Sequence, residues 1–171
     1  MTTIEIHLQP IVWEFLRSIG THDKLAVQIP QSHRYLYQLI TSNLEREQIQ
    51  SAAAINRHCS RMVKGNIYIT DYDAHRFGTY IRIERQAAIS HYIYNAECDR
   101  MCHLIIYTHL FAGISINAAT HLILEKYYPE SDENFAETIK KRYQRHYTEL
   151  EQRTMQEFQQ IKQSKKTQNR T

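Results

Sequence analysis

Four basic side chains are clustered in a short stretch near the C-terminal end of the chain: Lys140, Lys141, Arg142 and Arg145. On a helix, Lys141, Arg142 and Arg145 would project along one side, where they could contact successive phosphates of a nucleic acid. An ordinary solvated surface is the alternative. Glu137 and Lys141, and likewise Arg145 and Glu149, are spaced four residues apart and could form ion pairs. The cluster therefore indicates either a phosphate-binding face or a charged helix surface.

A helix junction is expected just upstream, in residues 104–127. A helix that ends at Gly113 is followed by Ser115 and a second helix over residues 116–127. Glycine permits a left-handed turn, and serine caps the helix that follows it. This order is typical of a helix-turn-helix, although two helices joined by a glycine turn are also a common packing unit in helical proteins. Both readings stay open at this point.

The faces of the second helix follow if Gly113 is aligned with the turn glycine of that motif. Ala119 and Leu122 then lie on the buried face. The outward face would meet base edges in a major groove, and it holds Asn117, Thr120, His121 and Leu124. Lys126 is the first basic residue of this helix. The fit is incomplete, because His109 occupies a position where a small residue usually lets the two helices approach.

Three cysteines and ten histidines raise the question of a metal site. Cys98 and Cys102 share one face of an expected helix beside His103, but structural zinc sites usually contain two such cysteine pairs. Buried free thiols are favoured, so we expect no metal ion and no cofactor. The cysteines are also too few for a disulfide framework, which favours reduced thiols in a cytoplasm.

Acid–base chemistry would have to come from Asp71, Asp73 and His75, which occur together in a polar segment. A segment of this composition is ordinarily a turn. The chain contains no glycine-rich phosphate loop, no G-x-S-x-G elbow and no H-E-x-x-H motif. The sequence therefore does not predict an enzyme.

The charge of the chain is unevenly distributed. The formal net charge is +3, and residues 132–171 contain nine Lys and Arg against six Asp and Glu. The remaining basic and acidic residues cancel over residues 1–131. Such asymmetry favours acidic partners such as nucleic acid, although a solvated helix surface would also produce it.

The elements that must position these groups can be read from local patterns. Ile4, Ile6 and Leu8 alternate with polar residues and predict a strand over residues 4–8. A helix starts at Pro10, a second strand covers residues 25–29, and another helix follows it. Residues 67–70 and 78–83 suit a hairpin around the segment 71–77, although a strand followed by an early helix start is also compatible with the pattern. Gly65 and Asn66 mark a turn before it. From residue 85 onward the pattern is helical, with breaks at Gly113 and Pro129.

These patterns predict an α+β fold that is predominantly helical, with a minor antiparallel sheet and a possible helix-turn-helix in the C-terminal half. We expect a single domain over residues 1–160 and a polar, frayed tail over residues 161–171. No apolar run approaches the roughly 20 residues of a membrane span, and no secretory signal precedes the first strand. A cytoplasmic protein without membrane contact is expected.

Several stretches resemble a group of small DNA-binding proteins encoded on mobile elements and prophages of gut bacteria. The stretches are Ile-Glu-Ile-His-Leu-Gln-Pro from residue 4, Trp-Glu-Phe-Leu from 13, Ile-Pro at 29, Tyr-Leu-Tyr from 35, Gly-Ile-Ser-Ile-Asn-Ala-Ala from 113, Glu-Lys-Tyr-Tyr from 125 and Ile-Lys-Lys-Arg-Tyr-Gln-Arg from 139. Together they comprise 34 of the 171 residues. The resemblance implies a DNA-binding or element-regulatory role and transfers no catalytic residue.

Two functional hypotheses follow from the sequence. In the first, residues 116–127 enter the major groove of double-stranded DNA while residues 140–145 hold phosphates. In the second, the protein is a non-enzymatic interaction or assembly module, because its twelve tyrosines suit helical interfaces and self-association into a homo-oligomer.

Overall fold

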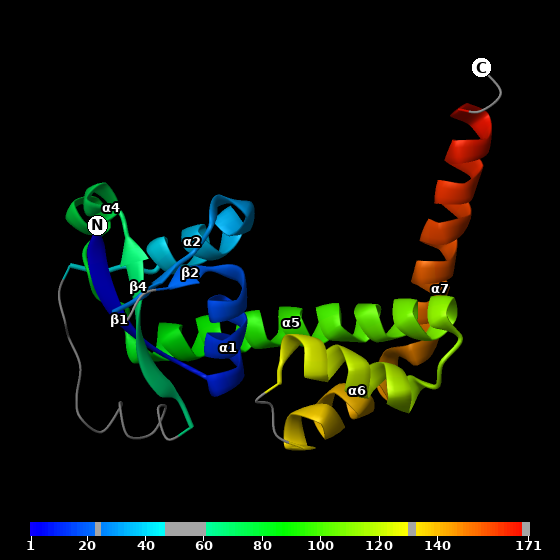
Figure 1. The fold of residues 1–171 in the computed structure, drawn as a ribbon. Helices are drawn as coiled ribbons and strands as arrows, with labels where there is room; N and C mark the ends of the chain where they lie inside the picture. Colours follow the sequence, from blue (N-terminus) through cyan, green and yellow to red (C-terminus); the bar gives the residue numbers. More distant parts are fainter. Residues whose placement is uncertain (23–24, 47–60, 130–132, 169–171) are drawn as a thin grey trace. The chain divides into compact units, whose positions relative to one another are not determined.

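The computed structural model describes the chain apart from residues 23–24, 47–60, 130–132 and 169–171. It is an α+β protein dominated by helices, as the sequence predicts. The sequence suggested one domain over residues 1–160, whereas the contacts divide the chain into two compact units, Met1–Asn95 and Ala96–Thr171. Helix α5 (Ile83–Ala112) is continuous across the division (Figure 1).

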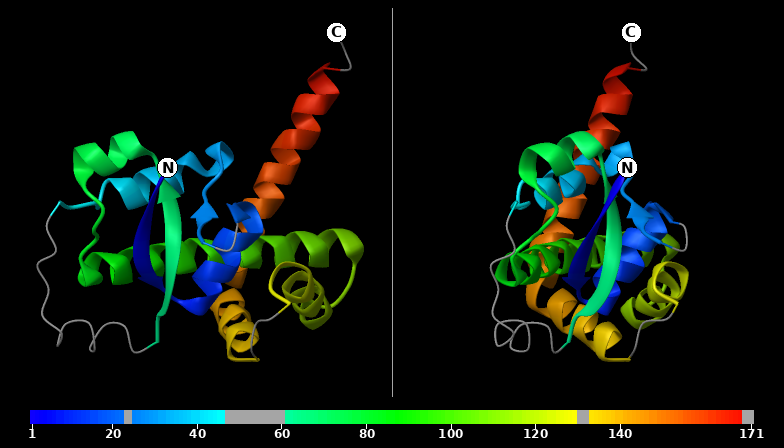
Figure 2. Two further views of the ribbon diagram at one scale, coloured as in Figure 1. Left: turned by 60° about the vertical axis from the view of Figure 1, so that its left-hand side comes forward. Right: turned by 90° about the vertical axis from the view of Figure 1, so that its left-hand side faces the viewer.

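The first unit contains a four-stranded sheet in the order β1-β4-β3-β2. Strands β1 (Thr2–Leu8) and β4 (Val63–Ile69) pair antiparallel along their whole length, as Figure 2 shows. Strand β3 (Val27–Gln28) is parallel to β4 and antiparallel to β2 (Thr21–His22). The sheet is therefore mixed, which corrects the antiparallel sheet that was expected. The predicted strand over residues 4–8 is confirmed, and Ile4, Ile6 and Leu8 are buried.

The predicted hairpin of residues 67–70 and 78–83 is wrong, and the alternative, a strand followed by an early helix start, is the one the structure has. Strand β4 pairs with β1 instead, and α4 (Asp71–Phe77) occupies the segment that was expected to be a loop. The expected turn at Gly65 is also absent, since Gly65 lies inside β4. A Cβ atom at this position would lie 2.4 Å from Cζ2 of Trp13, so glycine allows the indole to pack directly on the strand. The indole Nε1 donates to the Val63 carbonyl oxygen at 2.8 Å.

Helices pack on this sheet through apolar stripes and a few buried hydrogen bonds. They are α1 (Pro10–Ile19), the 3-10 turn η1 (Gln31–His33), α2 (Arg34–Thr41) and the first part of α5. Buried Gln86 of α5 accepts a hydrogen bond from the His7 amide at 2.7 Å, and the Ser90 hydroxyl accepts from the Gln9 amide at 2.9 Å. These bonds fix the beginning of α5 against the end of β1.

The second unit is helical and consists of the remainder of α5, α6 (Ile116–Tyr127) and α7 (Glu133–Gln168). Its core is formed by buried residues of all three helices: Cys98, Met101, Cys102, Ile105, Ala119, Ile123, Phe135, Ile139 and Tyr143. Helix α7 continues to Gln168, so most of the segment expected as a frayed tail extends the helix. Within the described ranges, no helix combines the length and apolar character needed to cross a membrane.

Candidate nucleic-acid interface

The junction between α5 and α6 has the local features that the sequence predicts. Gly113 has a φ of 63°, and the Ser115 hydroxyl accepts a hydrogen bond from the Ala118 amide at 3.2 Å. His109 has a defined role in this turn: its Nδ1 lies 2.6 Å from the Ile114 carbonyl oxygen, to which a protonated Nδ1 donates. These contacts establish a capped helix junction. Its use as a DNA-reading helix-turn-helix remains a prediction.

Helix α6 is rotated relative to the predicted alignment. Ala119 is buried as expected, but Thr120 and Leu124 are buried as well, whereas Leu122 is 52% exposed. Thr120 donates its hydroxyl hydrogen to the Ile116 carbonyl oxygen at 2.8 Å, so its assignment as a base-contacting residue is wrong. A shift of one residue turns a helix by about 100°, which accounts for the exchange of faces.

The exposed face of α6 nevertheless keeps three of the predicted contact residues, which are Asn117, His121 and Lys126. Lys126 lies in the last turn, with its Nζ 5.4 Å from the centre of the Tyr127 ring. The face also carries Leu122 and Glu125 and is therefore of mixed chemistry. The helix supplies an amide at its start and a cation at its end.

The basic cluster of α7 contains two side chains with carboxylate partners and two exposed side chains without them in the described part of the chain. Arg142 donates through Nε to Asp99 Oδ1 at 2.7 Å, and this hydrogen bond raises the pKa of Arg142. Arg142 therefore links α7 to α5, and its side chain is only partly exposed. Its assignment to phosphate binding is withdrawn. Lys140 lies 3.5 Å from Glu137 Oε1, the partner that was expected for Lys141.

Lys141 and Arg145 are the exposed cations of this cluster. Within the part of the chain that the structure describes, neither has a carboxylate within ion-pair distance, and the expected pair of Arg145 with Glu149 is not formed. Unpaired surface guanidinium and ammonium groups keep their donors available for phosphate oxygens. These two residues are therefore the best candidates for phosphate contacts on α7.

A pocket of about 430 Å³ lies between the start of α6 and α7. The first turn of α6 lines one side with Ser115, Ile116 and Asn117, and α7 lines the other with Lys140, Tyr143 and Gln144. Asn117 and Lys140 were separate predictions from the sequence, and the pocket brings them to one surface. The opening presents two amides and one ammonium group.

The other predicted groups do not converge on a site. Cys98 and Cys102 are buried free thiols, and burial raises the pKa of Cys102 to about 12. Cys59 lies outside the described residues. No group of three or more potential metal ligands occurs in the described part of the chain.

The segment with Asp71, Asp73 and His75 forms the short helix α4. The Asp71 carboxylate binds the N-terminal ammonium group and the Thr2 hydroxyl, at 3.0 and 2.7 Å. Asp73 accepts from the hydroxyls of Thr70 and Tyr37, and these hydrogen bonds lower its pKa. Both carboxylates are therefore engaged in hydrogen bonds at the start of α4 and with neighbouring residues. They form no acid–base cluster with His75, which is exposed.

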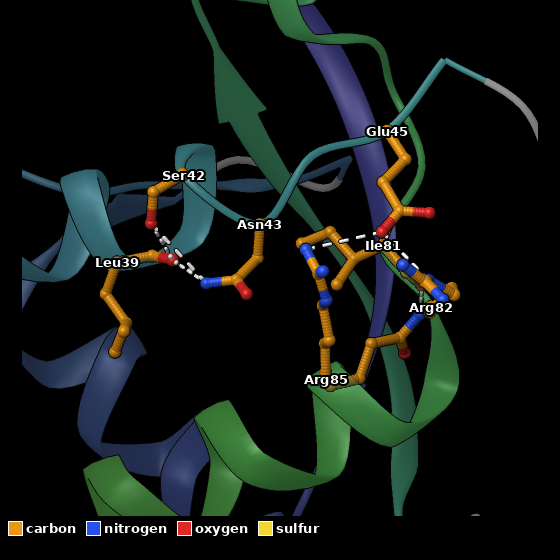
Figure 3. Close-up of polar contacts among 8 residues, drawn as sticks. Leu39, Ser42, Asn43, Glu45, Ile81, Arg82 and Arg85 are labelled. Atoms are coloured by element: carbon orange, nitrogen blue, oxygen red, sulfur yellow. Dashed lines mark hydrogen bonds and ion pairs between the residues drawn. The ribbon is translucent and has the colours of Figure 1, made fainter.

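Sequence reasoning missed a second charged surface, which lies in the first unit. Glu45 Oε1 accepts from Arg82 Nε at 2.8 Å and lies 3.3 Å from Arg85 Nη1 (Figure 3). The residues are about forty positions apart in the sequence. The only local signal for this group was the pair of arginines at the start of α5, where Arg82 precedes the helix and Arg85 lies in its first turn.

Comparisons of the chain with protein-family models, with curated proteins and with solved structures gave no match.

Proposed function

We propose that the second unit binds double-stranded DNA through α6 and α7 and that the protein is a DNA-binding or regulatory protein. The observation that carries this proposal is the pocket that places Asn117 and Lys140 on one surface. A base-reading amide and a phosphate-binding cation must lie close together if one DNA segment is to meet both. The resemblance noted in the sequence supports a role on a bacterial mobile element.

In this arrangement Asn117 and His121 approach base edges, since an asparagine amide can bond adenine through two hydrogen bonds. Lys140 contacts a phosphate at the pocket, Lys141 and Arg145 contact phosphates along α7, and Lys126 contacts them at the far end of α6. Thr120 and Arg142 take no part, because they are engaged within the unit. A cytoplasmic location is part of the proposal and is supported by the free thiols of Cys98 and Cys102.

The test is fluorescence anisotropy of the full chain with a labelled duplex of mixed sequence, titrated at several salt concentrations. Binding should weaken linearly with the logarithm of salt concentration. In the Lys141→Gln/Arg145→Gln variant, the slope should fall by about 0.9 for each phosphate that the variant no longer neutralises. The matched control is Arg17→Gln/Arg34→Gln, which removes two exposed cations from the first unit. Absence of binding at about 50 mM salt would overturn the proposal.

A protein-interaction role is the second candidate, and exposed aromatic side chains favour it. Tyr35, Tyr72, Tyr92 and Phe111 are each more than half exposed. Tyrosine is enriched at interfaces because it buries a large ring and keeps a polar hydroxyl. Light scattering over a range of protein concentrations would detect a homo-oligomer. A concentration-dependent mass that Tyr92→Ala abolishes would support this role, and a constant monomer mass would exclude self-association as its basis.

A further inference from the structure

An arginine-rich surface of the first unit is built around Glu45. The Glu45 backbone is fixed first: its amide donates to the Tyr80 carbonyl oxygen at 2.7 Å, and the Tyr80 amide donates back at 3.2 Å. Gly78 makes this approach possible, because a Cβ at Gly78 would lie 2.1 Å from the Glu45 carbonyl oxygen. The Glu45 backbone is therefore held in place, and Arg82 and Arg85 are directed to its carboxylate in Figure 3.

Two arginines share a single carboxylate at this surface. One carboxylate oxygen of Glu45 serves both Arg82 and Arg85, whose side chains are 49% and 44% exposed. A guanidinium group has five donors; Glu45 accepts one hydrogen bond from Arg82 and lies within ion-pair distance of Arg85. Both arginines lie at the start of the 30-residue helix α5, where the helix dipole disfavours cations and favours anions. Exposed Glu84 is the other carboxylate on this turn.

Two further arginines extend the surface toward α4. Arg46 donates through Nη2 to the Arg76 carbonyl oxygen at 3.1 Å. The Arg76 guanidinium lies 5.0 Å from the Phe77 ring centre and 5.9 Å from that of Tyr72, and it donates to the Tyr72 hydroxyl at 3.0 Å. Asp73 interacts electrostatically with Arg76, and its carboxylate accepts hydrogen bonds from Thr70 and Tyr37.

Two aromatic rings therefore lie beside Arg76 and are open to solvent. Tyr72 is 66% exposed and Phe77 is 37% exposed. Exposed rings and guanidinium planes are the groups on which unpaired bases stack, while arginine forks bind the phosphates that link those bases. A base-paired duplex keeps the faces of its bases covered, so it would use the arginines but not the rings.

We propose that this surface binds a single-stranded segment of nucleic acid. Arg46, Arg82 and Arg85 hold phosphates, and Tyr72, Arg76 and Phe77 stack on bases. The Glu45 carboxylate occupies the place of one phosphate oxygen in the free protein and competes with the incoming anion. The site lies in a different unit from the proposed duplex interface and does not require that interface to function.

The experiment compares the full chain and its variants in binding a labelled single-stranded oligonucleotide of mixed sequence, by fluorescence anisotropy. Arg82→Gln/Arg85→Gln should lower the salt slope by about 0.7 for each phosphate that the variant no longer neutralises. Tyr72→Ala should weaken binding by about 5- to 150-fold, the range found for one stacked base. Glu45→Gln should strengthen binding because it removes the internal competitor.

Controls separate this proposal from the one for the second unit. Arg17→Gln/Arg34→Gln and Tyr92→Ala remove the same chemistry from other exposed positions of the chain and should leave single-strand affinity unchanged. Lys141→Gln/Arg145→Gln should weaken duplex binding and leave single-strand binding unchanged. Circular dichroism and thermal unfolding verify that each variant is folded.

Several outcomes would overturn the inference. If a folded Arg82→Gln/Arg85→Gln variant kept the wild-type affinity for the single strand, the proposed phosphate contacts of these arginines would be contradicted. Unchanged affinity in Tyr72→Ala, together with equal competition by inorganic polyphosphate, would show a surface for anions alone. Preference for the duplex over the single strand at this surface, measured in the Lys141→Gln/Arg145→Gln background, would also contradict it.

Discussion

Tyr128, the residue that follows α6, donates its hydroxyl hydrogen to the buried carboxylate of Glu97 on α5. Glu97 also accepts hydrogen bonds from Arg100, whose guanidinium lies over the Tyr127 ring at 5.1 Å. Burial, together with the neighbouring carboxylate, raises the pKa of Tyr128. The ring of Tyr128 packs edge-on against Phe135 of α7. One tyrosine thus connects the three helices of the second unit.

Replacement of Tyr128 by Phe should destabilise the second unit. The substitution keeps the ring but removes a hydrogen bond to a buried carboxylate, which costs about 1–3 kcal/mol. The neighbouring variant Tyr127→Phe is the matched control and should change the free energy of unfolding by less than about 0.5 kcal/mol. Chemical denaturation monitored by circular dichroism measures both. Equal effects of the two substitutions would show that the Glu97 contact contributes nothing to stability.

Two glycines should respond differently to substitution by alanine. Both have positive φ angles, 63° at Gly113 and 104° at Gly78. A Cβ at Gly113 meets nothing within 4 Å, so Gly113→Ala should cost only about 1–2 kcal/mol for the left-handed conformation. Gly78→Ala adds a clash with the Glu45 backbone and should cost more. Thermal unfolding of the two variants should rank them in this order; the reverse order would contradict the tight approach of residues 45 and 78.

The thiol of Cys102 should be unreactive in the folded protein. Its pKa is raised from 9.0 to about 12 by burial, so almost no thiolate exists near neutral pH. In a Cys59→Ser background, we expect a thiol-reactive chromophore to label neither Cys98 nor Cys102 until denaturant is added. Both should then react at the rate of a free thiol. Rapid labelling of the native protein would show that this part of the core opens readily.

The rotation of α6 makes a specific prediction for DNA recognition. Asn117→Ala should relax discrimination between duplex sequences by about 1–3 kcal/mol, the contribution of a good base contact. Thr120→Val should leave duplex affinity unchanged, because Thr120 is buried and bonded within its own helix. Competition binding with a panel of duplexes measures both. A larger loss for Thr120→Val in a folded protein would indicate that the outward face is the one first predicted from the sequence.

Features that depend on neighbouring residues were predictable. The alternation of Ile4, Ile6 and Leu8 is sufficient for a strand with one buried face. Gly113 and Ser115 define the end of one helix and the cap of the next, because a left-handed turn and a capping hydroxyl act within three or four residues. The helical character of the C-terminal half followed from the same local signals.

Features that depend on distant partners were not predictable from those signals. Strand β4 was assigned a hairpin partner close in sequence, yet it pairs with β1, about sixty residues away. The apolar pattern of α6 allowed more than one buried face, and packing within the second unit selected the one containing Thr120 and Leu124. Alignment of the sequence with a motif takes no account of such packing.

The sequence by itself determined the fold class, most helix boundaries and the exposure of Lys141 and Arg145, because helix propensity, capping and charge act locally. Only the tertiary structure decided that Arg142 pairs with Asp99 and that Arg82 and Arg85 pair with Glu45. It also decided that Asn117 and Lys140 line one pocket. Each of these contacts joins residues more than twenty positions apart, and their approach depends on how whole elements pack. Packing is a cooperative property of the folded chain, and no short window of sequence contains it.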